Sequence, residues 1–335
     1  MKLISKALTG ATLLAASTLS FAADKVNVDN FVRADTDQTM VRYDKLGAFG
    51  QFFHMRQPTE IDAQKVIRMN LDTLYSFGIF DLDAGSVTIN KPKLDGRFQS
   101  MQVFNQDHYS WTEHDSGSST LTKEKVGTRY AIVLFRTFVD ASNKADIKLA
   151  NAAQDMITTN QAKKGSLELP EWDVASLNDV RAAILQVAKY MPNADKAFGM
   201  PGEVDPVRHF IGTALGWGGN PGYAAAYDNV VPAKNDGKTP YVLTVKDVPV
   251  NGFWSVTVYN EQGFMEKNEY NAYAFNNVTA DKNKDGSITI HFGGDPKASN
   301  YLPITKDWNY VARMYQPGED IQNGGYQFPK AQAVK

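Results

Sequence analysis

The sequence contains no cysteine in its 335 residues. This absence excludes disulfides, thiolate metal ligands, cysteine nucleophiles and lipidated cysteines. The chain also has little net charge, because 35 basic residues stand against 37 acidic ones. Such a balance creates no field that would attract nucleic acid or an anionic membrane, so we expect a small-molecule substrate or ligand. The sequence leaves the oligomeric state open, and a homo-oligomer is compatible with it.

Long apolar runs are scarce as well. One lies near the N-terminus, from Ala7 to Leu19, and it is too short and too rich in Ser and Thr to span a bilayer. Two lysines precede it, and Ser20-Phe21-Ala22 follows it as a small-x-small cleavage site. Residues 1–22 therefore predict a signal peptide that is removed before Ala23, and hence a periplasmic or secreted protein. No later run has the length of a membrane helix, so we expect no membrane span.

Several common catalytic motifs are missing too. There is no Gly-x-Ser-x-Gly elbow, no His-Glu-x-x-His and no Gly-x-Gly-x-x-Gly after a predicted strand, which argues against an ordinary α/β esterase, a zincin and a dinucleotide oxidoreductase. Residues 216–221 are glycine-rich but lack the Gly-Lys-Ser/Thr ending of a phosphate loop. We expect these glycines to provide positive φ angles that let Trp217 turn back onto neighbouring structure.

Short β-prone runs occur in two blocks, separated by turn-forming residues. The first block comprises residues 77–83, 86–89, 97–104 and 129–139, and the second comprises 241–248, 253–259, 287–292 and 309–315. Helical spacing of apolar residues marks 35–54, 143–164, 176–191 and 205–215, the last with Asp205 as cap and Pro206 in the first position.

These patterns predict a mainly β fold with α-helices. We expect two antiparallel β-sandwich-like modules joined by a helical segment. The expected boundaries are 23–140 for the N-terminal β module, 141–235 for the helical connector and 236–335 for the C-terminal β module. Short linkers and apolar helix faces predict that the modules fold as one unit.

The segment from Ile67 to Ser76 is the strongest candidate for a functional site. If it is extended, Asn70 and Asp72 project from one face, opposite the apolar residues, as in the wall of a cleft. The alternative is that Asp72 and Thr73 cap a helix or a turn through local hydrogen bonds.

The densest group of titratable residues lies at 105–115. Its histidines and carboxylates are ligand types that Zn, Mn or Fe accept, but their spacing matches no known metal motif, so a divalent metal remains only an alternative. We prefer a general acid/base role for His108, which follows a predicted strand. His209 fits either a site role or a hydrogen-bonded position at the edge of the core.

Asp281–Gly286 resembles the start of a calcium loop, but Phe292 occupies the position of the required Glu, so we expect a hairpin turn.

Alternation in the C-terminal strands separates an apolar face from a polar one. Trp254, Val256 and Val258 share one side, and Ser255, Thr257 and Tyr259 share the other, while Arg313 and Tyr315 alternate with apolar residues in the last strand. The polar sides can line a cleft in which Arg313 binds a carboxylate or another anion. The alternative places Arg313 on an outer face, paired with a nearby acid.

Several separate motifs carry a family resemblance. Residues 68–76, Arg-Met-Asn-x-Asp-Thr-Leu-Tyr-Ser, followed by Phe80-Asp81-Leu82-Asp83, resemble domain of unknown function 1254. The motifs at 216–221, 250–260, 285–287, 301–303 and 313–315 resemble domain of unknown function 1214. The resemblance covers nearly all of the mature chain and implies the fold, but no activity.

Two classes of function remain. The first is a hydrolase-like enzyme that acts on a small polar or carboxylate-bearing substrate in a cleft between the modules. Asp72 with His108 or His209 would be its acid/base pair, and Ser76, Ser100 and Ser255 are conceivable nucleophiles. The second is a non-catalytic binder of small molecules or glycans. The residues that we expect to contact the ligand in either case are Asn70, Tyr75, Trp217, Trp254, Tyr259, Arg313 and Tyr315.

Overall fold

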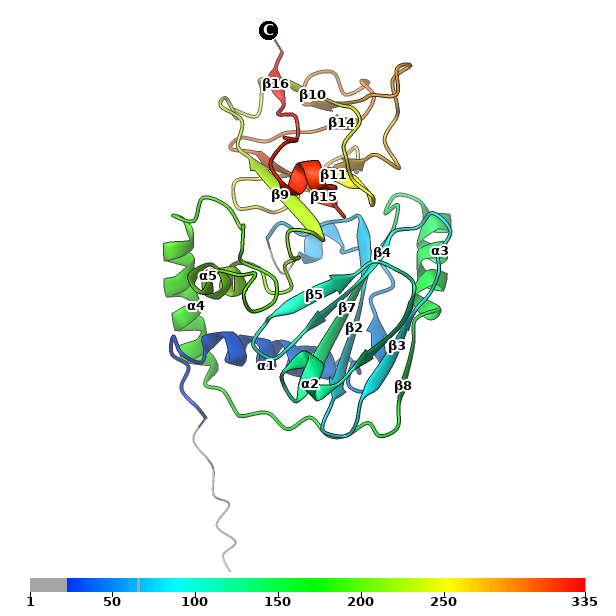
Figure 1. Cartoon of the computed structure of the whole chain (residues 1–335). Coiled ribbons are helices and arrows are strands. Elements are labelled where there is room, and N and C mark those ends of the chain that lie inside the picture. Colours follow the sequence, from blue (N-terminus) through cyan, green and yellow to red (C-terminus); the bar gives the residue numbers. More distant parts are fainter. Residues whose placement is uncertain (1–22, 65–66, 335) are drawn as a thin grey trace, which may run out of the picture.

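The structure is a computed structural model that describes residues 23–64 and 67–334. The predicted signal peptide lies outside these residues. Two β-rich modules lie one above the other, and α-helices lie on both sides of the lower, N-terminal module (Figure 1). Among the described residues, none of the helices combines the length and apolar character needed to cross a membrane.

The N-terminal module is a two-sheet sandwich. Its larger sheet has the order β1-β2-β7-β4-β5, and its smaller sheet has the order β6-β3-β8, with antiparallel pairing throughout. Apolar residues of β2, β4 and β7 pack against those of β3 and β6 between the sheets. The larger sheet comprises β1 (Phe52–His54), β2 (Thr73–Asp81), β4 (Gln99–Phe104), β5 (Ser110–Glu113) and β7 (Tyr130–Phe138). The smaller one comprises β3 (Val87–Lys91), β6 (Gly117–Leu121) and β8 (Thr158–Gln161), and the short helices η1 (Ile61–Ala63) and α2 (Lys123–Val126) lie in loops.

Helix α1 (Phe31–Asp44) covers the other face of the larger sheet through Met40 and Tyr43. The predicted helix at 35–54 is therefore wrong in its second half. Gly47 and Gly50 follow α1 with φ angles of +88° and +67°, which end the helix, and β1 begins soon afterwards.

The connecting region contains helices, and it also supplies one strand to each module. The predicted helix at 143–164 ends at Asp155 as α3 (Lys144–Asp155), and β8 then pairs with β3. Helices α4 (Val174–Ala188) and α5 (Pro206–Leu215) pack against α1. Asp205 caps α5 as predicted, accepting hydrogen bonds from the backbone of Val207 and Arg208. Strand β9 (Ala225–Val230) then joins the C-terminal module.

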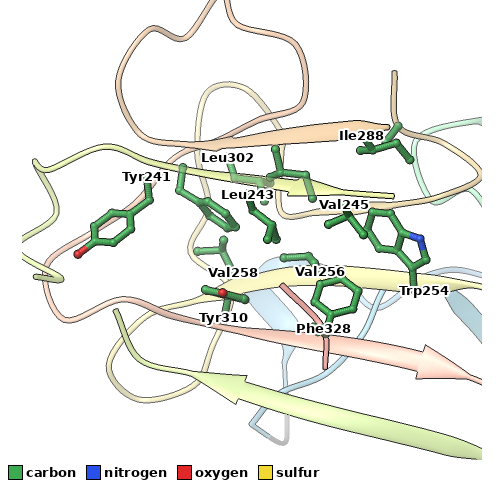
Figure 2. Close-up of a cluster of buried hydrophobic side chains, with 14 of the residues drawn as sticks. Tyr241, Leu243, Val245, Trp254, Val256, Val258, Ile288, Leu302, Tyr310 and Phe328 are labelled. Carbon is green, nitrogen blue, oxygen red and sulfur yellow. The ribbon is translucent and has the colours of Figure 1, made fainter. Parts of the chain in front are cut away.

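The C-terminal module is a second sandwich, with sheet orders β14-β13-β10-β16 and β12-β11-β15-β9. The pairing is antiparallel except between β13 and β14. Trp254, Val256 and Val258 point into the core between the two sheets, as their alternation predicts (Figure 2). The strands are β10 (Tyr241–Val245), β11 (Trp254–Tyr259), β12 (Ala274–Asn276), β13 (Ile288–Phe292), β14 (Tyr301–Leu302), β15 (Asn309–Tyr315) and β16 (Gln332–Ala333), with the short helix α6 (Glu319–Gln322) after β15.

Two further expectations need correction. The region between the predicted strands 97–104 and 129–139 contains two strands that the sequence patterns did not predict. They are β5, which pairs with β4, and β6, which pairs with β3. The segment at 281–286 is a turn, in which Asn283 N donates to Ser287 O, but it does not close a hairpin, because β13 pairs with β10.

Candidate functional site

The segment from Ile67 to Asp72 lies at the seam between the modules and is not a strand. Arg68 has a φ angle of +56°, and Asn70 Oδ1 accepts hydrogen bonds from the backbone nitrogens of Asp72 (3.1 Å) and Thr73 (3.3 Å). This local bonding forms a turn, so β2 begins only at Thr73 and the expected extended face before it is wrong. It is Asn70, and not Asp72, that makes the turn.

Side chains of the C-terminal module donate hydrogen bonds to the backbone carbonyls of this turn. Arg313 Nη2 donates to Arg68 O at 2.8 Å, and the Tyr259 hydroxyl donates to Met69 O at 2.7 Å. Arg313 also donates to Thr257 Oγ1 (3.0 Å) and to the Tyr259 hydroxyl (2.6 Å). The two modules are therefore joined by hydrogen bonds from buried side chains of β11 and β15.

One row of paired positions crosses the sheet that faces this turn. Asn276 pairs with Ser255, Ser255 with Arg313, and Arg313 with Tyr227, and side chains at paired positions of neighbouring strands share a face. We use the name inter-module polar cluster for the side chains that meet at the seam, which are Asn70, Asp72, Tyr75, Arg136, Tyr227, Ser255, Asn276, Arg313 and Tyr315.

Asp72 is the carboxylate of the cluster and is only 2% exposed. Burial raises its pKa, and the nearby Ser255 hydroxyl, Arg313 and Asn276 oppose this shift. Its Oδ1 accepts from Asn276 Nδ2 at 3.2 Å, whereas Oδ2 and the Ser255 hydroxyl each lack a hydrogen-bond partner of normal geometry among the described residues. No ion pair within 4 Å joins Asp72 to Arg313 in this part of the chain. The cluster thus contains a carboxylate and a hydroxyl with unused bonding capacity.

Arg313 is buried and forms no ion pair with a carboxylate within residues 23–64 and 67–334. Burial alone would lower its pKa, but the hydroxyls of Tyr259 and Tyr315 and the carboxylate of Asp72 outweigh burial and raise it. The guanidinium therefore stays charged, and oxygen atoms of neutral groups surround it.

Three tyrosine hydroxyls of the cluster accept a hydrogen bond but have no acceptor for their own proton among the described residues. Asn70 Nδ2 donates to both Tyr75 (3.2 Å) and Tyr315 (3.0 Å), and Asn220 Nδ2 donates to Tyr227 (2.7 Å). A phenolic hydroxyl can donate one hydrogen bond in addition to accepting, so three donors remain free. Burial raises the pKa of Tyr315 well above its ordinary value, which keeps this hydroxyl protonated.

Arg136 is a member that the sequence reasoning missed. It pairs with Tyr75 across β2 and β7, and its guanidinium lies 5.8 Å from the centre of that ring. Its nitrogens donate to Gln102 Oε1 (2.6 Å), Asn220 Oδ1 (3.0 Å) and Gly218 O (2.5 Å). In the sequence, the signal that could have identified Arg136 was a charged residue within the largely apolar run of β7.

His108 and His209 do not join the cluster. His108 is 1% exposed, its Nε2 accepts from Gly218 N at 2.8 Å, and its Nδ1 lies 2.9 Å from Thr213 Oγ1. Burial lowers its pKa well below the ordinary value, and His209 adds to this effect, so the ring is neutral. The ring nitrogens of His209 face the carbonyls of Ala197 (3.1 Å) and Asp107 (3.0 Å). In this arrangement both histidines make hydrogen bonds to backbone groups of the protein, and neither has a ring nitrogen free to bond a substrate.

The two tryptophans expected at the site also lie elsewhere. Trp217 stacks on Phe104, with ring centroids 4.9 Å apart, and donates to Thr36 Oγ1 at 3.1 Å. Trp254 packs against Phe328 on the core side of β11 (Figure 2). By contrast, the structure brings Asn70, Asp72, Tyr75, Tyr259, Arg313 and Tyr315 together at the seam. Among residues 23–64 and 67–334, no three His, Asp or Glu side chains gather as metal ligands.

Comparison with known proteins gives matches of family and fold. The protein of unknown function family DUF1254 matches residues 49–125, and the protein of unknown function family DUF1214 matches residues 223–319. No curated protein matches the chain. Among solved structures, the VPA0106 protein of Vibrio parahaemolyticus aligns at 19% identity with a TM-score of 0.67, over 92% of this chain and 100% of its own.

A second solved structure, an uncharacterised protein from Burkholderia cenocepacia, aligns at 14% identity with a TM-score of 0.47, over 91% of this chain and 87% of its own. The Vibrio structure shares the fold of this chain. The family matches confirm the resemblance drawn from the sequence motifs. The chain therefore carries both domains of unknown function, DUF1254 followed by DUF1214.

Proposed function

We propose that this is an exported protein that binds a small molecule carrying a carboxylate or carbonyl oxygen at the inter-module polar cluster. The observation that carries the proposal is the set of three tyrosine hydroxyls, of Tyr75, Tyr227 and Tyr315, that have no acceptor for their protons among the described residues. Tyr315 is buried, and buried donors are normally satisfied, while Tyr75 and Tyr227 extend the row of free donors toward the surface. Free donors at a domain seam favour an acceptor supplied by a ligand.

The charges of the cluster favour the same class of ligand. Two buried arginines, Arg136 and Arg313, stand beside a single carboxylate, Asp72, whose charged form burial disfavours. An incoming carboxylate would offset this excess of positive charge and accept from the hydroxyls. Tyr227 is 38% exposed and Tyr75 is half-buried, which makes this the side from which we expect a ligand to enter.

The test uses tyrosine-to-phenylalanine variants, which remove each hydroxyl and keep the ring. Binding of a panel of small carboxylates, amides and sugars would be measured by calorimetry for the wild type and for the Tyr75→Phe, Tyr227→Phe, Tyr315→Phe triple variant. We expect carboxylate or carbonyl ligands to lose at least tenfold in affinity, since each lost hydrogen bond contributes about 1 kcal/mol. Tyr190→Phe is the control, because that ring is 87% exposed. Unchanged affinity in the triple variant would refute the proposal.

A hydrolase is the second candidate, favoured by the Ser255 hydroxyl next to the Asp72 carboxylate, since neither the hydroxyl nor Asp72 Oδ2 has another partner among the described residues. A carboxylate that takes the proton of a hydroxyl is a general-base arrangement, although Ser255 is fully buried. Turnover of a set of small esters should then disappear in Asp72→Asn and in Ser255→Ala, while carboxylate binding persists. Binding without turnover of any ester would leave the protein a binder.

A further inference from the structure

A separate cavity of about 320 Å³ opens elsewhere along the seam. The N-terminal module provides most of its wall, from residues 91–94, 96–99 and 114–116, and the C-terminal module closes it with Asn251, Gly252 and Gln316. Its volume lies at the lower end of the range for small-molecule sites. None of the tyrosines of the inter-module polar cluster lines it.

The lining of this cavity is cationic. Lys91, Lys93 and Arg97 stand against one acidic residue, Asp115. Arg97 is already paired with Asp146, at 2.5 Å, so Lys91 and Lys93 against Asp115 leave an excess of one positive charge. Lys91 is only 8% exposed and its Nζ donates to the carbonyl of His114, so its ammonium group is held in place. Burial lowers the pKa of Lys91, and Asp115 and Glu113 oppose this shift.

The wall also contains buried polar groups without partners. Gln99 is 4% exposed and its Oε1 has no hydrogen-bond partner among the described residues, while its Nε2 donates to Thr137 Oγ1 at 3.0 Å. The threonine hydroxyl can also donate, so the amide can turn and direct its NH₂ group away from Thr137. Neither ring nitrogen of His114 has a partner in this part of the chain. These atoms are shielded from solvent, so they lie behind the cavity surface and the charged side chains are the groups that face a ligand.

We propose that this cavity is a second binding site, distinct from the inter-module polar cluster, and that it takes a small organic anion such as a dicarboxylate. Lys91 and Lys93 supply the charge that attracts the anion. A cation is disfavoured by the two lysines, and an uncharged ligand would not offset the excess positive charge of the lining. Because both modules form the wall, the anion also bridges the seam.

The test places a charge in the wall at Ser116, which is exposed and makes no hydrogen bond to the described residues. Succinate binding would be measured by calorimetry for the wild type, Ser116→Glu and Ser116→Gln, with uncharged succinamide as the comparison probe. The introduced carboxylate should weaken succinate binding roughly three- to tenfold through charge repulsion over several ångströms, and the neutral, similarly sized Gln should not. Asp115→Asn should strengthen binding, and succinamide should not respond to either charge change.

The inter-module polar cluster could also bind succinate, so its contribution is separated with Tyr227→Phe. We expect this variant to leave the difference between Ser116→Glu and Ser116→Gln intact. Equal succinate affinities of the Glu and Gln variants would overturn the cavity proposal, whatever happens at the tyrosines. The proposal would also be overturned if succinate does not bind, or if Asp115→Asn leaves the succinate affinity unchanged.

Discussion

Acidification should destabilise the fold through His114. Its ring lies behind Phe98, with centroids 5.9 Å apart, and both ring nitrogens are buried. Burial and the nearby charge of Lys91 lower its pKa from 6.5 to about 4, Arg136 adds to this effect, and Asp115 opposes it. The unfolded chain therefore binds a proton at this residue at a higher pH than the folded chain does.

The sign and size of the effect follow from that difference. A lowered pKa contributes stability that is fully present above pH 6.5 and is lost as the pH falls through about 4. At about 1.4 kcal/mol for each pKa unit, the free energy of unfolding should drop by roughly 2 kcal/mol between pH 7 and pH 4.5 from this residue. Other groups titrate over the same range, so the contribution must be isolated by mutation.

The assay is urea unfolding, followed by tryptophan fluorescence, of the wild type and His114→Leu at both pH values. We expect the variant to lose roughly 2 kcal/mol less than the wild type on acidification, and to be at least as stable at neutral pH, because no hydrogen bond is broken. Leu243→Ala is the control for general loss of packing, since this residue lies in the core of the C-terminal module and its loss should lower stability equally at both pH values. If His114→Leu and the wild type show the same pH dependence, the reasoning about this buried imidazole is wrong.

Four further predictions concern the fold and the processing of the chain. Arg313→Met should lower the free energy of unfolding by about 3 kcal/mol, because it leaves the buried acceptors Thr257 Oγ1 and Arg68 O without their donor, and urea denaturation would measure this loss. Asp205→Ala should cost about 1 kcal/mol in the same assay by removing the cap of α5. Limited proteolysis should yield no stable fragment ending near residue 235, since β8 and β9 tie the connector to opposite modules; two separately folding halves would contradict this. Intact-mass measurement of the exported protein should give a chain that starts at Ala23, and a full-length cytoplasmic product would contradict the signal peptide.

The sequence by itself determined the features that depend on local patterns. Strict alternation in β11 placed Trp254 and Val256 in the core and Ser255 and Thr257 on the opposite face, because successive side chains of a strand point to opposite sides. The Asp205-Pro206 pair fixed the start of α5, because capping needs only the residues at the helix end. Asn70 and Tyr315, which we expected to contact the same ligand, are joined by a hydrogen bond at the seam.

Only the tertiary structure decided which polar groups have hydrogen-bond partners and which do not. His108 looked like an acid/base residue in sequence, but the fold packs it against Thr213 and Gly218, which engage both of its nitrogens. Arg136 looked like one cation in an apolar strand, and only the return of the chain at Gly218 and Asn220 makes it part of the site. Hydrogen-bond partners distant in sequence depend on how elements pack, and no local pattern records that packing.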